Sequence, residues 1–75
     1  MARTIYWVSP RNDEWIVKQQ GGSKPIGVFE IKKGAIDRGI EVAKNNKPSQ
    51  LKIQLRNGKI EREYTYGDDP FPPRG

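Results

Sequence analysis

The stretch LKIQLRNGKIEREYTY, residues 51–66, predicts an antiparallel β-hairpin. Apolar and polar residues alternate on both sides of Asn57–Gly58, as they do in two paired strands that bury one face. An Asn-Gly pair between two such runs is typical of a type I′ turn, in which both central residues adopt positive φ. We therefore expect a tight turn at Asn57–Gly58 that sets the register of the whole hairpin.

The register counted from this turn pairs Leu55 with Ile60, Ile53 with Arg62 and Leu51 with Tyr64, and it divides the hairpin into two faces. One face is expected to be apolar apart from Arg62, and it collects Leu51, Ile53, Leu55, Ile60, Tyr64 and Tyr66. The opposite face is expected to carry polar cross-strand pairs, Lys52 with Glu63 and Gln54 with Glu61. The two tyrosines are therefore predicted to belong to the core and not to a binding surface.

The segment before the hairpin has the apolar period of an α-helix that begins at Lys32. Its stripe of small and apolar residues consists of Ala35, Ile36, Gly39, Ile40 and Ala43. The small residues would let the helix lie close against a sheet, and Pro48 is expected to end the helix at Asn45–Asn46. Ile31 has no side-chain oxygen for the N-cap position, so we expect Glu30 to cap the helix.

The N-terminal part of the chain is rich in β-branched and aromatic residues and predicts three strands. Thr4–Ser9 and Glu14–Gln19 are expected to form a hairpin with a loop longer than two residues, and IGVFEI, residues 26–31, a short third strand. The order β-β-β-α-β-β predicts an α+β fold, a small antiparallel β-sheet with one helix packed on one face. We expect a single domain over residues 4–67, followed by a Pro-rich tail over residues 68–75.

The composition excludes several kinds of active site. The 75 residues include no cysteine and no histidine, so the chain lacks thiolate nucleophiles, the commonest general base and the commonest metal ligand. Its acidic pairs, Asp13–Glu14 and Asp68–Asp69, are interpreted as solvated turns because the sequence offers no third ligand near them. We therefore expect no catalytic residue, no cofactor and no metal site, and we interpret the protein as a non-enzyme.

Lysine and arginine outnumber aspartate and glutamate by 14 to 9, which gives a formal net charge of +5. Such an excess favours polyanions or acidic proteins as partners, but it does not specify one. The apolar run near the N-terminus, Ile5–Val8, is too short for a signal peptide or a membrane span. We therefore expect a cytoplasmic protein with no membrane partner.

Several stretches, taken in their order and spacing, resemble a small bacterial and phage family known as domain of unknown function 2188. They are YWVSPRNDEWIVK from Tyr6, VFEIKKGAIDRGIEVAKNN from Val28, the LRNG turn, and IEREYTYGDDPFP, which ends at Pro72. The resemblance implies a compact α+β unit for which no activity is established. It places core and turn positions, none of them catalytic, at Val8, Pro10, Trp15, Val17, Phe29, Ala35, Ala43, Gly58 and Tyr66.

The candidate partner-binding surface is the sheet face that the predicted helix leaves open. If Tyr6 and Val8 face the helix, the alternate residues of the first hairpin face away from it. This open face is expected to carry Ile5, Trp7, Ile16, Lys18, Lys52, Gln54 and Arg56, with Lys59 beside the second turn. An exposed apolar cluster indicates an interface, so we expect a protein partner or self-association as a homo-oligomer. The alternative is a nucleic acid, single-stranded or DNA, with bases stacked on Trp7 and phosphates bound by lysine and arginine.

Two further features have both a functional and an ordinary interpretation. The tip formed by Arg56 and Lys59 has the charge to enter a groove of duplex DNA, but we interpret it as an ordinary hairpin turn with solvated flanks. The segment PFPPR, residues 70–74, has the spacing of a polyproline ligand. We interpret it as a strand terminator, because proline cannot donate a hydrogen bond to a neighbouring strand, with Phe71 able to fold back onto the sheet.

Overall fold

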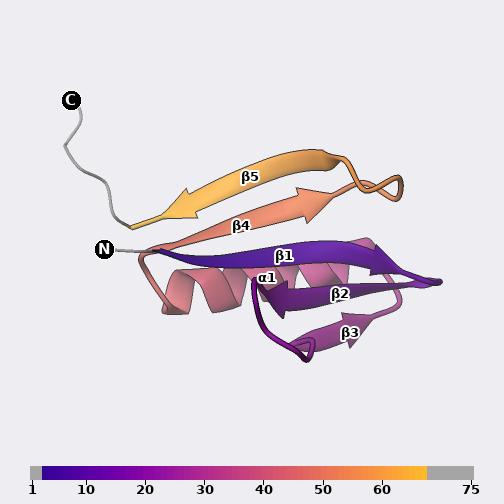
Figure 1. The fold of residues 1–75 in the computed structure, drawn as a ribbon, viewed down its shortest axis with the longest axis horizontal. Helices are drawn as coiled ribbons and strands as arrows, with labels where there is room; N and C mark the ends of the chain where they lie inside the picture. The colour runs from indigo at the N-terminus through magenta and orange to yellow at the C-terminus, as the bar shows by residue number, and fades with distance from the viewer. Residues whose placement is uncertain (1–2, 68–75) are drawn as a thin grey trace.

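The computed structural model describes residues 3–67, which form five strands and one helix (Figure 1). In chain order they are β1 (Thr4–Arg11), β2 (Glu14–Gln19), β3 (Gly27–Phe29), α1 (Lys32–Asn45), β4 (Ser49–Gln54) and β5 (Ile60–Tyr66). This order confirms the predicted β-β-β-α-β-β arrangement and the α+β class. The Pro-rich tail at residues 68–75, with the expected contact of Phe71, lies outside the described residues.

The strands form one mixed sheet in the order β3-β2-β1-β4-β5. The outer pairs are antiparallel, whereas β1 and β4 run parallel, with Tyr6 beside Leu51. The expectation of a wholly antiparallel sheet is therefore wrong for this central pair. The reason is the path of the chain: two reversals leave β3 parallel to β1, and α1 then carries the chain back, so that β4 starts at the same end as β1.

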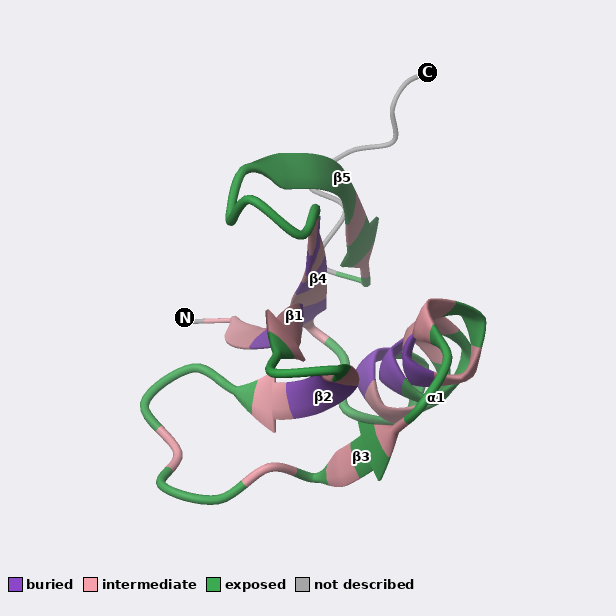
Figure 2. Cartoon of the chain, turned by 90° about the vertical axis from the view of Figure 1, so that its right-hand side faces the viewer, coloured by how far each residue is buried: buried purple, intermediate pink, exposed green. Residues whose placement is uncertain are grey.

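α1 covers one face of the sheet and leaves the other face open (Figure 2). Its buried residues, Ala35, Gly39 and Ala43, belong to the predicted stripe. A Cβ atom on Gly39 would lie 3.0 Å from Leu51 Cδ1 and 3.2 Å from Val8 Cγ2, so the helix backbone rests directly on β1 and β4. The core beneath it consists of Tyr6, Val8, Trp15, Val17, Ala35, Ala43, Leu51 and Ile53.

The two ends of α1 are held in different ways. At the N-terminal end, Ile31 occupies the cap position with an extended backbone and no side-chain capping bond, so the expected cap by Glu30 is not formed. At the C-terminal end, the buried Ser49 hydroxyl donates a hydrogen bond of 2.5 Å to the carbonyl oxygen of Ala43. This bond satisfies one of the last carbonyl groups of the helix and ties the helix to β4.

The β4–β5 hairpin keeps the predicted register far from its turn and loses it near the turn. The predicted pairs Leu51–Tyr64, Lys52–Glu63 and Ile53–Arg62 are confirmed. The register then shifts, so that Gln54 opposes Ile60 and not Glu61, and the predicted pair of Leu55 with Ile60 is wrong. Ile60 consequently leaves the core face and is 45% exposed, and Leu55 is 38% exposed.

This register shift follows from the type of turn. Gly58 has a φ of 91°, but Asn57 does not have the positive φ that the expected type I′ turn requires. Instead, the Gly58 N–H donates to the Leu55 carbonyl oxygen at 2.9 Å, and the Leu55 N–H donates to the Lys59 carbonyl oxygen at 2.7 Å. These bonds are typical of a three-residue loop with glycine in the left-handed position, which introduces a bulge. The Asn57 side-chain oxygen accepts a hydrogen bond from the Lys59 N–H at 3.0 Å and stabilises this turn.

The first hairpin is longer and its turn is tighter than expected. β1 continues to Arg11, which opposes Glu14, so that residues 12–13 alone form the turn. Asn12 has a φ of 57°, a left-handed conformation that asparagine tolerates better than most residues. The prediction of a longer loop is wrong because it assigns Pro10 to the loop, whereas Pro10 belongs to β1.

Candidate interaction surface

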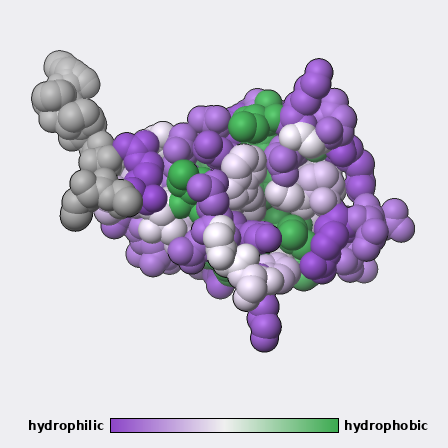
Figure 3. Space-filling view, viewed as in Figure 1, coloured by the Kyte–Doolittle hydropathy of each residue, from purple (hydrophilic) through white to green (hydrophobic). Residues whose placement is uncertain are grey.

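The face of the sheet turned away from α1 is the candidate site. Figure 3 shows this face, on which hydrophilic side chains cover most of the surface and hydrophobic side chains form separate spots between them. In the side view of Figure 2, α1 lies on the opposite side of the sheet. Strand alternation therefore leaves one row of side chains from each strand available to a partner.

Trp7 lies on the middle strand of this face, between lysines on the two neighbouring strands. Lys18 of β2 and Lys52 of β4 are its direct cross-strand partners. The Lys52 ammonium nitrogen lies 5.2 Å from the centroid of the Trp7 ring, within the range of a cation–π contact. The indole Nε1–H donates a hydrogen bond of 2.9 Å to the side-chain oxygen of Gln20. These two contacts hold the ring in one orientation before any partner binds.

Ile5 and Ile16, the other apolar residues of the predicted surface, lie on the same side of the sheet as Trp7. Ile5 is half-buried, and Ile16 is only 8% exposed, which is less than an open face suggests. Val28, the partner of Ile16 on β3, is 46% exposed and continues the apolar surface to the edge of the sheet. The sequence reasoning misses Val28, although its alternation with Phe29 indicates its face once β3 is placed beside β2.

Arg56 does not belong to this face. The Arg56 guanidinium carbon lies 5.2 Å from the centroid of the Trp15 ring, and its Nη1 donates to the Asn12 carbonyl oxygen at 2.9 Å. Trp15 is a core residue, so Arg56 covers the end of the core where the two hairpin turns meet. Lys59 is exposed in the second turn. The prediction that Arg56 shares a face with Trp7 is therefore wrong, because β4 ends at Gln54 and Arg56 lies in the turn that follows it.

The open face is close to electrically neutral. Among the residues of the five strands, alternation places three basic and two acidic side chains on it, an excess of one: Arg11, Lys18, Lys52, Glu14 and Glu63. The chain as a whole has a net charge of +5, so most of its positive excess lies elsewhere. What this face offers to a partner is apolar surface, one oriented indole ring and two lysine ammonium groups beside it.

The tyrosines of β5 lie at the margin of the core and not on the open face. Their rings stack with centroids 6.3 Å apart, and both side chains pack against the core while they remain partly exposed. Burial raises the pKa of Tyr66 above its ordinary value. Arg62 Nη1 donates a hydrogen bond of 3.0 Å to the Tyr64 hydroxyl oxygen, and this bond raises the pKa of Arg62.

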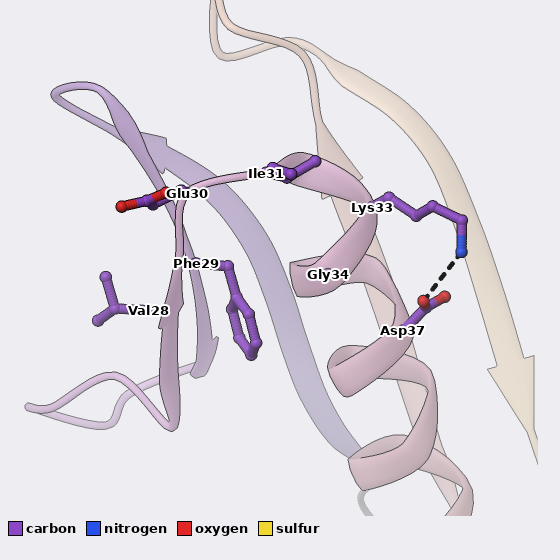
Figure 4. A pocket seen from close by; sticks show the side chains of 7 residues that line it. All are labelled: Val28, Phe29, Glu30, Ile31, Lys33, Gly34 and Asp37. Atoms are coloured by element: carbon purple, nitrogen blue, oxygen red, sulfur yellow. Dashed lines mark hydrogen bonds and ion pairs between the residues drawn. The ribbon is translucent and has the colours of Figure 1, made fainter.

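The helix side of the sheet carries a larger and a smaller hollow. The larger hollow, of about 500 Å³, lies between β3 and the first turns of α1, where Phe29, Ile31 and Asp37 contribute to its lining (Figure 4). The smaller hollow, of about 120 Å³, lies between α1 and β5. Beside it Lys32 forms an ion pair with Glu61, in which the ammonium group donates a hydrogen bond to the carboxylate. This hydrogen bond lowers the pKa of the Glu61 carboxyl group.

Within residues 3–67, no three acidic side chains come together in a group that could hold a metal ion. The helix that these residues form, α1, is too short and too polar to cross a membrane.

Comparison with known proteins places the chain in a family. Residues 6–66 match the model of a family described as an uncharacterized protein conserved in bacteria, DUF2188. The matched region begins in β1 and extends to the last residue of β5. No curated protein and no solved structure matches the chain. The protein belongs to the bacterial family DUF2188, as the order of its sequence motifs indicates.

Proposed function

We propose that the protein is a non-enzymatic interaction module that binds another protein through the open face of its sheet. The observation that carries this proposal is the fixed orientation of Trp7, whose ring is held by Lys52 and by a hydrogen bond to Gln20. A side chain that is already ordered loses little conformational entropy when a partner covers it. Tryptophan is also among the residues that contribute most to binding energy at protein interfaces.

The neighbours of Trp7 support a protein as the partner. Ile5, Ile16 and Val28 provide apolar surface on the same face, and Lys18 and Lys52 lie beside the ring. Apolar and aromatic surface bordered by polar groups is the composition of an interface core and its rim. The weak net charge of this face favours a protein over a nucleic acid, whose affinity depends largely on the number of phosphate contacts.

One observation favours a nucleic acid as the second candidate function. Lys18 and Lys52 lie on either side of Trp7 in register, so a base stacked on the indole ring would have an ammonium group near each flanking phosphate. Binding of this kind would weaken steeply as the salt concentration rises. Nucleic-acid binding is the second candidate because the Lys52 ammonium group already lies over the indole ring on which a base would stack.

Affinity capture from a nuclease-treated bacterial lysate tests the proposal. The wild-type protein, Trp7→Ala and Leu55→Ala serve as baits, and circular dichroism checks that the variants keep the fold. Leu55→Ala is the matched control, because Leu55 is also an exposed large apolar residue but lies at the tip of the second hairpin. We expect proteins that bind the wild type and Leu55→Ala and are lost with Trp7→Ala.

Two outcomes would change this conclusion. Capture of the same proteins by all three baits would contradict a role of Trp7 as the anchor. If nuclease treatment removes all capture, a mobility-shift assay with an oligothymidine strand becomes decisive. A shift that disappears with Trp7→Ala and at raised salt would replace the first function with the second.

A further inference from the structure

The outer edge of β3 is unpaired within the described chain. β3 stands at one end of the strand order and pairs with β2 on its inner side. Figures 1 and 2 show no element of residues 3–67 beyond this edge. An exposed strand edge presents N–H and C=O groups with which another strand can pair.

The opposite edge of the sheet, β5, is a poor site for such pairing. It carries consecutive charged residues, Glu61, Arg62 and Glu63, and the register shift that follows the second turn lies beside them. Charges and bulges on an edge strand discourage pairing with another chain. β3 has no charged residue between Gly27 and Phe29, and Pro25 interrupts the edge only before the strand begins, so the two edges differ in how they are protected.

Exposed apolar side chains gather at the β3 edge. Three of the large apolar residues that are exposed in the described chain lie in β3 or next to it: Ile26, Val28 and Ile31, the last of them 69% exposed. Figure 4 shows how alternation divides β3, since Phe29 points toward α1 and Val28 points to the other side. The hollow of about 500 Å³ lies on the Phe29 side, so a strand added to β3 would find apolar surface on both of its faces.

The sequence around this edge is complementary to a second copy of itself. In KPIGVFE, residues 24–30, a lysine and an isoleucine precede Gly27 and a valine and a glutamate follow it at the same distances. β3 itself consists of Gly27–Phe29, and the pairing requires the residues on either side to extend it. If two copies then pair antiparallel with Gly27 at the centre, Ile26 of one faces Val28 of the other, and Lys24 faces Glu30. Within residues 3–67, neither Lys24 nor Glu30 takes part in an ion pair, so both charges are available.

We propose that two copies of this protein associate by antiparallel pairing of β3 with β3. A two-fold axis that is perpendicular to the sheet and passes between the two Gly27 residues joins the two five-stranded sheets into one continuous sheet. The same axis keeps the open faces of both copies on the same side of the joined sheet, so both Trp7 side chains lie on that side. Because the paired edge is short, the dimer is weak and reversible. It uses the edge of the sheet and shares Val28 with the open face, whereas Trp7, the anchor of the proposed function, lies on β1, two strands away. The two proposals are therefore tested separately.

Sedimentation velocity of the full chain tests this association over a concentration range of about 1 μM to 1 mM. We expect the wild type to change from monomer to dimer within this range at low salt. Val28→Lys is expected to remain monomeric throughout. In the antiparallel pair, the lysine at position 28 of each copy would lie opposite Ile26 of the other copy. Val28 is exposed, so the variant should keep its fold, which circular dichroism checks. Trp7→Ala is the matched control and is expected to dimerise as the wild type does.

Exchange of the two charges tests the register. Lys24→Glu or Glu30→Lys alone is expected to weaken the dimer about tenfold, since each turns two attractive cross-strand pairs into two repulsive ones. The double variant, with both charges exchanged, is expected to recover the wild-type dissociation constant.

A wild type that stays monomeric over the whole range would overturn the proposal, and so would a dimer that survives Val28→Lys. A dimer that is lost with Trp7→Ala but kept with Val28→Lys would place self-association on the open face instead. Failure of the double charge variant to recover would overturn the pairing centred on Gly27.

Discussion

β4 and β5 belong to one hairpin, yet every second residue of β4 is buried, whereas β5 is mostly exposed. On β4, Ser49, Leu51 and Ile53 are each at most 1% exposed, because α1 and two neighbouring strands cover them. β5 has one neighbouring strand and lies at the edge of the sheet, beyond the strands that α1 covers (Figure 2). The difference shows that alternation in the sequence marks which residues can face a core. The part of the sheet that α1 covers then decides which of these residues are buried.

Truncation of one apolar residue on each strand should give the largest contrast. Leu51→Ala is expected to lower the free energy of unfolding by about 3 kcal/mol, because it removes buried surface and leaves a cavity beneath α1. Ile60→Ala, on β5, is expected to lower it by less than about 0.5 kcal/mol. Urea unfolding followed by circular dichroism measures both. Effects of equal size would contradict the difference in coverage between the two strands.

The hydroxyl groups of the two strands allow a sharper comparison. Ser49→Ala removes the donor that satisfies the Ala43 carbonyl group, and we expect it to cost about 1 kcal/mol of unfolding free energy. Thr65→Val, a change of the same shape on the exposed strand β5, is expected to have an effect near zero. The same urea experiment compares the two variants, and a neutral Ser49→Ala would show that this hydroxyl does not hold the end of the helix.

The smallest expected effect concerns the ion pair that links β5 to α1. The hydrogen bond from Lys32 lowers the pKa of Glu61 in the folded protein, so protonation of this carboxylate favours the unfolded state. Its contribution to stability is present above the unfolded pKa and is lost as the pH falls through the folded pKa. An NMR titration of the Glu61 side chain should give a lower pKa in the wild type than in Lys32→Met. An identical pKa in both proteins would mean that the bond does not form in solution.

The sequence predicts the helix and the strands of this fold better than it predicts which strands pair with one another. The helical stripe and the strand alternation depend on residues that are close in the chain, and α1 lies where its stripe places it. The parallel pairing of β1 with β4 joins Thr4 to Ser49, 45 positions later, and it follows from the path of the chain across the sheet. No local pattern contains that information, so the sequence alone indicates a wholly antiparallel sheet.

The candidate site is predictable within the same limits. Ile5, Trp7 and Ile16 follow from alternation within one hairpin, and the structure places them on one face. Arg56 is misplaced by sequence reasoning because β4 ends at Gln54 and Arg56 lies in the three-residue turn, where strand alternation no longer sets the direction of a side chain. Val28 is missed because a strand of three residues is too short for alternation to identify its face.

The two tryptophans of the chain divide between the two faces of the sheet, and this gives the protein two intrinsic fluorescent reporters. Trp15 is buried in the core, and the Lys32 ammonium and Arg56 guanidinium groups both contact its ring, so its emission responds to unfolding. Trp7 lies on the open face beside Lys52, so its emission responds to a partner that covers it. With Trp7→Phe only the core emits, and with Trp15→Phe only the open face emits. The molecule can thus report optically whether a variant has lost its fold or only its partner.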